Sequence, residues 1–287
     1  MPKLLFFTKT GQHLSTPETA VQKLTKTEIL YSLKVHLGFL SNIFKKKEPV
    51  ASLTDFSSVG VDFHSHLIPG IDDGAQTLEQ SLHLIKGLHD LGYRKIITSP
   101  HIMTDGYPNK PDNILAGRDK VRQALKENGI AVEFDAWAEY YLDETIKKKI
   151  DERSLLTMAG NYVLVELSYL MKSFSATSYF YDLRAAGYNV VLAHPERYPY
   201  YHEESLEQYR EIKDQGIFFQ MNMASLTGVY GKSAKVISEK LIDAEMIDFI
   251  STDLHNERHL GYIRDCLKLP YIEKIVKSET LKNSIFL

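Results

Sequence analysis

Histidine and acidic residues recur at several places in this sequence, each directly after a short apolar run. The first place is Asp62-Phe63-His64-Ser65-His66, with Asp72-Asp73-Gly74 close behind it. Because side chains alternate between the two faces of a strand, His64 and His66 should point in the same direction. Imidazoles and carboxylates are common protein ligands of divalent metal ions. We therefore interpret this segment as one part of a metal site, with Asp73 as a ligand and Asp72 as a turn residue that could take the place of Asp73.

The other places with the same character are widely separated in the sequence. They are Ser99-Pro100-His101, Ala138-Glu139-Tyr140, Ala193-His194-Pro195 and Thr252-Asp253-Leu254-His255. A single histidine of this kind is more commonly a hydrogen-bonded polar residue, but the recurrence at matching positions indicates one multinuclear metal centre. The predicted ligands are His64, His66, Asp73, His101, Glu139, His194, Asp253 and His255.

The elements that must position these ligands follow a regular alternation. Seven β-rich runs, near residues 60–63, 95–98, 132–134, 162–165, 190–192, 217–219 and 249–251, recur about every thirty residues, the length of a strand-helix unit. Helical patterns lie between them, as in Leu78, Leu82, Ile85 and Leu88. Such alternation predicts a parallel sheet. Because the ligands follow the strands' carboxyl ends, where a closed barrel would gather them, we predict a seven-stranded TIM-like (β/α)7 barrel.

Residues 1–50 do not follow this alternation. They contain the amphipathic spacing Leu30, Leu33, Leu37 and Leu40, followed by Lys45-Lys46-Lys47-Glu48-Pro49. We predict an N-terminal extension over 1–50 and a catalytic domain over 51–287. A poorly ordered extension and a helix that docks on the barrel, a partner or a membrane surface both stay open.

Composition narrows the classes of function. The net charge is -3, so no basic excess indicates nucleic-acid binding. The single cysteine, Cys266, excludes an intramolecular disulfide framework and a thiolate zinc cluster, and no arginine lies six residues after it, as a cysteine phosphatase loop would require. No apolar run approaches the ~20 residues that span a bilayer. We expect a cytoplasmic protein without a transmembrane segment.

Arg197 lies three residues after the predicted ligand His194, in His194-Pro195-Glu196-Arg197-Tyr198. A guanidinium at that position suits an anionic substrate, because it binds phosphate oxygens through two hydrogen bonds. Arg258 is a second candidate for the same role. We therefore expect Arg197 and His194 to be catalytic, and Arg197 and Arg258 to bind substrate.

The motifs together resemble the polymerase and histidinol phosphatase (PHP) superfamily. The resemblance rests on Asp-Phe-His-Ser-His with Asp-Asp-Gly, Ser-Pro-His, Ala-Glu-Tyr-Tyr-Leu, Ala-His-Pro-Glu-Arg-Tyr and Ser-Thr-Asp-Leu-His-Asn, in family order from about Gly60 to near the C-terminus. It is closest to the bacterial manganese-dependent protein-tyrosine phosphatases of capsule and exopolysaccharide synthesis. Two departures matter. Trp137 stands where relatives usually have glycine, which would reshape the pocket floor, and the loop after His255 does not align Arg258 with the family's second arginine.

The resemblance implies a distorted seven-stranded barrel with three divalent metal ions, expected to be manganese, with iron or zinc also compatible. One ion would be held by His64, His66, Glu139 and Asp253. A second would share Glu139 and add His101 and His194, and the third would take Asp73 and His255. Arg197 matches the family's phosphate-binding arginine.

The resemblance also implies a function. We expect a protein-tyrosine phosphatase that uses a metal-activated hydroxide and regulates polysaccharide synthesis or export. Its partner would be a phosphotyrosyl protein, the tyrosine-rich tail of a bacterial tyrosine kinase, and not a nucleic acid. Alternatives are a phosphatase for a small monoester such as histidinol phosphate, a nuclease, and a binding module without catalysis.

Overall fold

The computed structural model describes residues 53–202 and 205–287. The predicted extension over 1–50 lies outside the described residues. Within the described part, no helix is both long enough and apolar enough to cross a bilayer. The account below concerns this part of the chain.

All strand pairings of the described residues are parallel, as the alternation of runs predicted. One sheet has the order β1-β2-β4 and the other has the order β3-β5-β6-β7-β8-β9. The strands are β1 (Val61–Asp62), β2 (Lys95–Thr98), β3 (His101–Ile102), β4 (Glu133–Ala136), β5 (Glu139–Tyr141), β6 (Tyr162–Glu166), β7 (Asn189–Ala193), β8 (Phe218–Asn222) and β9 (Phe249–Ser251).

The seven predicted strand positions are all present, but two of them are interrupted. Ser99 and Pro100 separate β2 from β3, and Trp137 and Ala138 separate β4 from β5. Pro100 has no N–H to donate to a ladder, which accounts for the first break. The described strands therefore form two sheets and not one continuous ladder. Near the site, the Asp253 N–H donates to the His64 carbonyl at 2.7 Å and the His66 N–H to the Leu254 carbonyl at 2.9 Å, which joins the far edge of the large sheet to β1.

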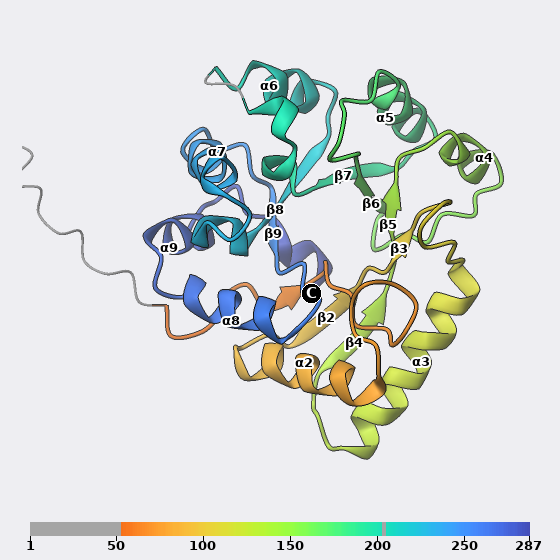
Figure 1. The fold of residues 1–287 in the computed structure, drawn as a ribbon, viewed down its shortest axis with the longest axis vertical. Helices are drawn as coiled ribbons and strands as arrows, with labels where there is room; N and C mark the ends of the chain where they lie inside the picture. Colours follow the sequence, from red (N-terminus) through yellow and green to blue (C-terminus); the bar gives the residue numbers. More distant parts are fainter. Residues whose placement is uncertain (1–52, 203–204) are drawn as a thin grey trace, which may run out of the picture. The chain divides into compact units, whose positions relative to one another are not determined.

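Helices lie around the outside of the strands, as Figure 1 shows in a view that places the C-terminus near the middle of the ring. They are α2 (Leu78–Asp90), α3 (Pro111–Glu127), α4 (Thr145–Asp151), α5 (Ala176–Ala185), α6 (Glu207–Asp214), α7 (Lys232–Asp243), α8 (Glu257–Cys266) and α9 (Pro270–Val276). Short 3-10 turns follow β7 (Pro195–Arg197 and Pro199–Tyr201), β8 (Met223–Thr227) and α9 (Asn283–Phe286). This mixed α/β arrangement confirms the predicted fold class.

Two apolar clusters hold the strands and helices in place. The larger one contains side chains of the strands and the helices, such as Leu88, Ile96 and Leu241. The smaller one joins strand residues of both sheets with Phe286 near the C-terminus. Trp137 belongs to it: its side chain is fully buried and its Nε1–H donates to the Phe63 carbonyl at 2.7 Å. Trp137 therefore packs in the interior and does not line the floor of the pocket, contrary to the expectation from the sequence.

Candidate metal centre

The eight predicted ligands come together at the carboxyl ends of the strands. His64 and His66 follow β1, and Asp253 and His255 follow β9. His101 and Glu139 begin β3 and β5, His194 follows β7, and Asp73 lies in the loop before α2. Segments that are up to 190 residues apart in the sequence thus meet in one place, because parallel strands carry their ends to the same rim.

Five of these side chains form a buried inner group around the Glu139 carboxylate: His64, His66, Glu139, His194 and Asp253. The His64 Nε2 lies 3.2 Å from Glu139 Oε2 and 3.3 Å from Asp253 Oδ1. The His66 Nε2 lies 3.4 Å from the same two oxygens. On the other side of the carboxylate, His194 Nε2 lies 3.1 Å from Glu139 Oε1. The nitrogen and oxygen atoms of these residues therefore lie close enough together to bind a shared metal ion.

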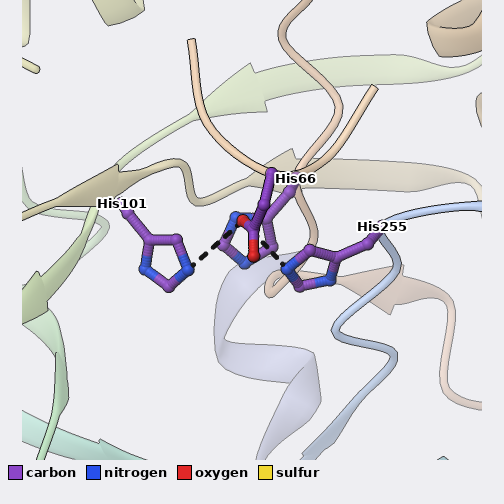
Figure 2. A group of neighbouring side chains, drawn as sticks. His66, His101 and His255 are labelled. Carbon is purple, nitrogen blue, oxygen red and sulfur yellow. Dashed lines mark ion pairs between the residues drawn. The ribbon is translucent and has the colours of Figure 1, made fainter. Parts of the chain in front are cut away.

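The remaining three, Asp73, His101 and His255, form an outer group. The Asp73 Oδ1 lies 3.4 Å from His255 Nε2 and 3.6 Å from His101 Nε2. Figure 2 shows the rings of His101 and His255 on either side of His66, which stacks on His255 with the ring centroids 4.0 Å apart. The side chain of Asp73 is 50% exposed, whereas those of His101 and His255 are 12% and 13% exposed. The outer group therefore opens towards solvent.

Several buried atoms at this centre lack a hydrogen-bond partner. They are His64 Nε2, His66 Nε2, His101 Nδ1 and Glu139 Oε2. Buried polar atoms are nearly always paired, so a cluster of unpaired ones indicates a missing partner. Every one of these atoms can donate a lone pair to a cation. The residues present thus fit divalent metal ions bound by nitrogen and oxygen.

The opposite ring nitrogens of the inner histidines are held by fixed acceptors. His64 Nδ1 lies 2.7 Å from Gln220 Oε1, and His66 Nδ1 lies 2.8 Å from Asp72 Oδ2. With Nδ1 protonated, each Nε2 presents its lone pair to the centre, as in known metal sites. Asp72, interpreted from the sequence as a turn residue, also accepts the Gly74 N–H. It therefore orients a histidine as well as closing the turn.

Glu166 joins this site although the sequence analysis did not identify it. It is the last residue of β6, and its carboxylate lies 3.7 Å from His194 Nε2 and 3.9 Å from His101 Nδ1. Burial, together with the negative charge of Glu139, raises the pKa of Glu166 to about 8. His101, Glu139 and Glu166 offer atoms close enough to share one ion. The available signal was its position at the end of a predicted strand.

The pKa values within the inner group diverge. Burial opposes protonation of His64, but the carboxylates of Glu139 and Asp253 outweigh it and raise its pKa to about 9. Burial lowers the pKa of His194 to about 4, so this imidazole is neutral at pH 7. Burial also lowers the pKa of His101. In the metal-free protein, His64 therefore carries a proton that a metal ion must displace.

Arg197 points at this centre from the turn after β7. Its Nη1 donates to Asp253 Oδ2 at 2.9 Å. The guanidinium carbon lies 4.8 Å from the ring centroid of Tyr169 and 4.2 Å from that of Tyr230. Both distances are within the range of cation–π attraction, so the two rings restrict where the guanidinium can go. Arg258 is exposed on α8 and does not line the cavity described next.

A cavity of about 350 Å³ opens over the outer group and Arg197. Its walls combine metal-site residues with residues of the surrounding loops: Asp73, His101, Glu139, Glu166, Tyr169, His194, Arg197, Tyr230, Asp253, His255, Asn256 and His259. Asn222, at the end of β8, donates to Asp253 Oδ2 at 2.6 Å and does not itself line the cavity. Tyr169 and Tyr230, which flank Arg197, were not singled out as site residues from the sequence. Tyrosines in loops follow neither helix nor strand periodicity, so the sequence pattern did not indicate that these two lie at the site.

Two residues of the centre have left-handed backbones. His194 has a φ of 36° and Asp253 a φ of 50°. Such conformations cost about 1–3 kcal/mol each in residues other than glycine and are found preferentially at functional sites. The turn at His194 sends the chain directly into the segment that carries Arg197. Cys266, by contrast, is buried in α8, where its Sγ lies 3.3 Å from the Met223 carbonyl oxygen, and takes no part in the site.

Comparison with known proteins agrees with this geometry. Residues 60–287 match the family model described as "Capsular polysaccharide synthesis, CpsB/CapC". Tyrosine-protein phosphatase YwqE of Bacillus subtilis is 30% identical over 197 residues, which cover 68% of this chain and 77% of that protein. Tyrosine-protein phosphatase CpsB of Streptococcus pneumoniae is 24% identical over 204 residues, which cover 68% and 83%.

A solved structure gives the same result. The crystal structures of YwqE from Bacillus subtilis and CpsB from Streptococcus pneumoniae are described as those of metal-dependent tyrosine phosphatases. The matching chain has a TM-score of 0.69 and 29% sequence identity, and the match covers 77% of this chain and 89% of that one. The family inferred from the motifs is confirmed: the chain belongs to the CpsB/CapC family of capsular polysaccharide synthesis.

Proposed function

We propose that this chain is a metal-dependent protein-tyrosine phosphatase whose catalytic domain spans 51–287. The observation that carries the proposal is the cluster of unpaired buried nitrogen and oxygen atoms beside Arg197. A site of this composition binds cations, and a guanidinium next to it suits a phosphate group. The relatives named above are tyrosine-protein phosphatases, which supports the same activity here.

We propose three divalent ions, with manganese as the native metal. The inner group would hold one ion through His64, His66, Glu139 and Asp253. A second ion would lie between the two groups, held by Glu139, His101 and His194, with Glu166 close enough to share it. The outer ion would be held by Asp73 and His255, with His66 and His101 within reach. When bound, such ions lower the pKa of water from about 15.7 towards 7 and so supply hydroxide near neutral pH.

The chain's own residues bind and orient the substrate. Arg197 remains protonated, because its electrostatic interactions with Tyr169 and with the Asp253 carboxylate outweigh the effect of burial and raise its pKa further. Its guanidinium can bind two phosphoryl oxygens while the rings of Tyr169 and Tyr230 limit its movement. A tyrosine leaving group, with a pKa of about 10, needs less protonation than an alkyl alcohol. This difference favours an aryl phosphate as substrate.

The partner we propose is a phosphotyrosyl protein, the tyrosine-rich tail of a bacterial tyrosine kinase, in the cytoplasm. Dephosphorylation would then regulate polysaccharide synthesis or export, the process named in the family description. The competing substrate is a small phosphate monoester such as histidinol phosphate, which would use the same metal centre.

The test compares kcat/KM of the manganese-reloaded protein on a phosphotyrosyl peptide and on histidinol phosphate. We expect a strong preference for the peptide, loss of turnover with a chelator, and recovery when manganese is returned. The His194→Ala variant should lose most turnover on both substrates. A preference for histidinol phosphate would contradict the proposed substrate and retain the metal centre, and near wild-type activity of His194→Ala would contradict the site.

A further inference from the structure

The loop between β6 and α5, residues 167–175, presents three large apolar side chains to solvent. Leu170 is 94% exposed, Met171 70% and Phe174 102%. Large exposed apolar side chains that occur singly are normal, but three within five residues form a patch that usually marks an interaction site. We call these three side chains the rim patch.

The backbone of this loop is held at its base, so the exposure of the rim patch is not explained by a loose loop. The Tyr198 hydroxyl accepts the Leu167 N–H at 3.0 Å, and the Tyr200 hydroxyl donates to the Ser168 carbonyl at 2.6 Å. Lys172, in the middle of the loop, turns back: its Nζ donates to Gln208 Oε1 and lies 5.2 Å from the ring centroid of Tyr201. The loop thus ties its exposed lysine to neighbouring side chains, whereas the three apolar side chains stay exposed to solvent.

The rim patch begins at the residue directly after one that lines the catalytic cavity. Tyr169, the residue before Leu170, lines that cavity and contacts both Arg197 and His194. An extended peptide advances about 3.3–3.6 Å per residue. A phosphotyrosine in the cavity would therefore bring residues two to four positions away over this loop. A small monoester would leave the rim patch unused.

Two other binding partners, a membrane surface and a second copy of this chain, fit the rim patch less well. Membrane-binding loops usually direct their lysines towards anionic headgroups, whereas Lys172 is hydrogen-bonded to Gln208, and residues 51–287 contain more acidic than basic side chains. A stable dimer buries about 800 Å² of surface on each partner, whereas three side chains offer only roughly a few hundred Å² of apolar surface. The position of the rim patch directly after Tyr169, which lines the cavity, favours a phosphotyrosyl substrate over a membrane or a second copy of the chain.

We infer that the rim patch binds apolar residues that flank the phosphotyrosine of a protein substrate. This inference rests on the proposed function and names its substrate class: phosphotyrosyl segments with apolar neighbours. The patch would select among phosphotyrosyl sites and contribute nothing to the chemical step. Its contribution would therefore be found in KM and in peptide affinity.

The test uses the full-length, manganese-loaded protein and a triple variant, Leu170→Ser, Met171→Ser and Phe174→Ser. Substrates are two phosphotyrosyl peptides, with leucine or with serine at the flanking positions, and p-nitrophenyl phosphate. The wild type should have a KM about tenfold lower for the leucine peptide than for the serine peptide. The triple variant should lose this preference, while its rate on p-nitrophenyl phosphate stays within about twofold of the wild-type rate. Val236→Ser, which removes a 38% exposed side chain from α7, is the matched control and should keep the preference.

A binding measurement separates recognition from turnover. Fluorescence anisotropy with the leucine peptide carrying a non-hydrolysable difluoromethyl phosphonate should give a Kd about tenfold weaker for the triple variant. An unchanged Kd and peptide preference would overturn the inference. So would a change of oligomeric state in the triple variant, seen by light scattering, because it would make the patch a contact between copies. Failure of the wild type to hydrolyse any of the three phosphates would contradict the proposed function itself.

Discussion

The inner and outer groups of the centre use similar side chains in contrasting surroundings. In the inner group, His64, His66 and Glu139 are at most 1% exposed, and Gln220 and Asp72 hold the histidine rings from behind. In the outer group, Asp73 is half exposed and lies in a loop. Preorganised ligands lose less entropy on binding a metal. The difference predicts that the inner group would hold a metal ion more tightly than the outer group, whose metal would exchange more readily or contact substrate.

The largest effect should follow from removing the carboxylate at the middle of the inner group. In Glu139→Gln, four histidines would lose their shared anionic partner, so we expect kcat/KM to fall by about 10³-fold or more, with most of the metal lost. Activity assays and elemental analysis of the purified protein measure both. Glu133→Gln, at an exposed position on β4, is the control and should behave as wild type. If Glu139→Gln kept its full metal content, the role of Glu139 as the shared ligand of the inner group would be wrong.

A smaller loss is expected from the outer group. Asp73→Asn removes the charge that lies between His101 and His255, so we expect about one equivalent less bound metal and a 10- to 100-fold fall in kcat/KM. Titration with manganese should restore part of the activity, because the inner ligands remain. A loss as large as that of Glu139→Gln, not restored by manganese, would remove the distinction between the groups.

The two groups should also differ in their dependence on pH. The pKa of His64 is raised to about 9, so its proton must leave before metal binds. The pKa of Asp73 is lowered to about 2, because hydrogen bonding to His255 outweighs burial, so this outer carboxylate is already ionised at pH 7. Inner-site affinity should therefore rise up to about tenfold per pH unit between pH 7 and 9 for each proton displaced, and outer-site affinity should change less. Calorimetry in buffers with different ionisation enthalpies counts the protons released. Equal proton release at both sites would contradict this prediction.

The smallest effect should come from the aromatic rings around Arg197, which reaches the inner group through Asp253. Tyr230→Leu removes one ring face and should raise KM by about fivefold, with little change in kcat, because a cation–π contact contributes about 0.5–1 kcal/mol or somewhat more when desolvated. Tyr230→Phe keeps the ring and should restore the wild-type KM. Equal effects of the two variants would assign the role to the hydroxyl.

The sequence alone was sufficient to predict those ligands that recur in the same local pattern. The ligands His64, His66, His194 and His255 stand out because histidine is rare and each follows an apolar run. Glu166 was missed because a single acid between Val165 and Leu167 also suits an exposed strand end. Only the pairing of β6 with β5 and β7 places that carboxylate beside His101 and His194.

Other features depended on packing that a single sequence does not encode locally. The roles of Gln220 and Asp72 arise from contacts between β8 or a turn and the histidines after β1. The breaks at residues 99–100 and 137–138 depend on how two sheets meet, although Pro100 was a visible cue. Arg258 was placed near the site by its spacing from His255, but the first turn of α8 carries it to the surface.

The environment of Cys266 has a consequence for how such an enzyme would respond to oxidative stress. Its thiol is the only one in the chain, it is fully buried, and burial raises its pKa to about 12. Peroxide attacks thiolates, and phosphatases that rely on an acidic cysteine are inactivated in this way. A phosphatase with this centre therefore lacks the thiolate through which peroxide inactivates cysteine-based enzymes, and its response to peroxide would depend on its metal ions instead.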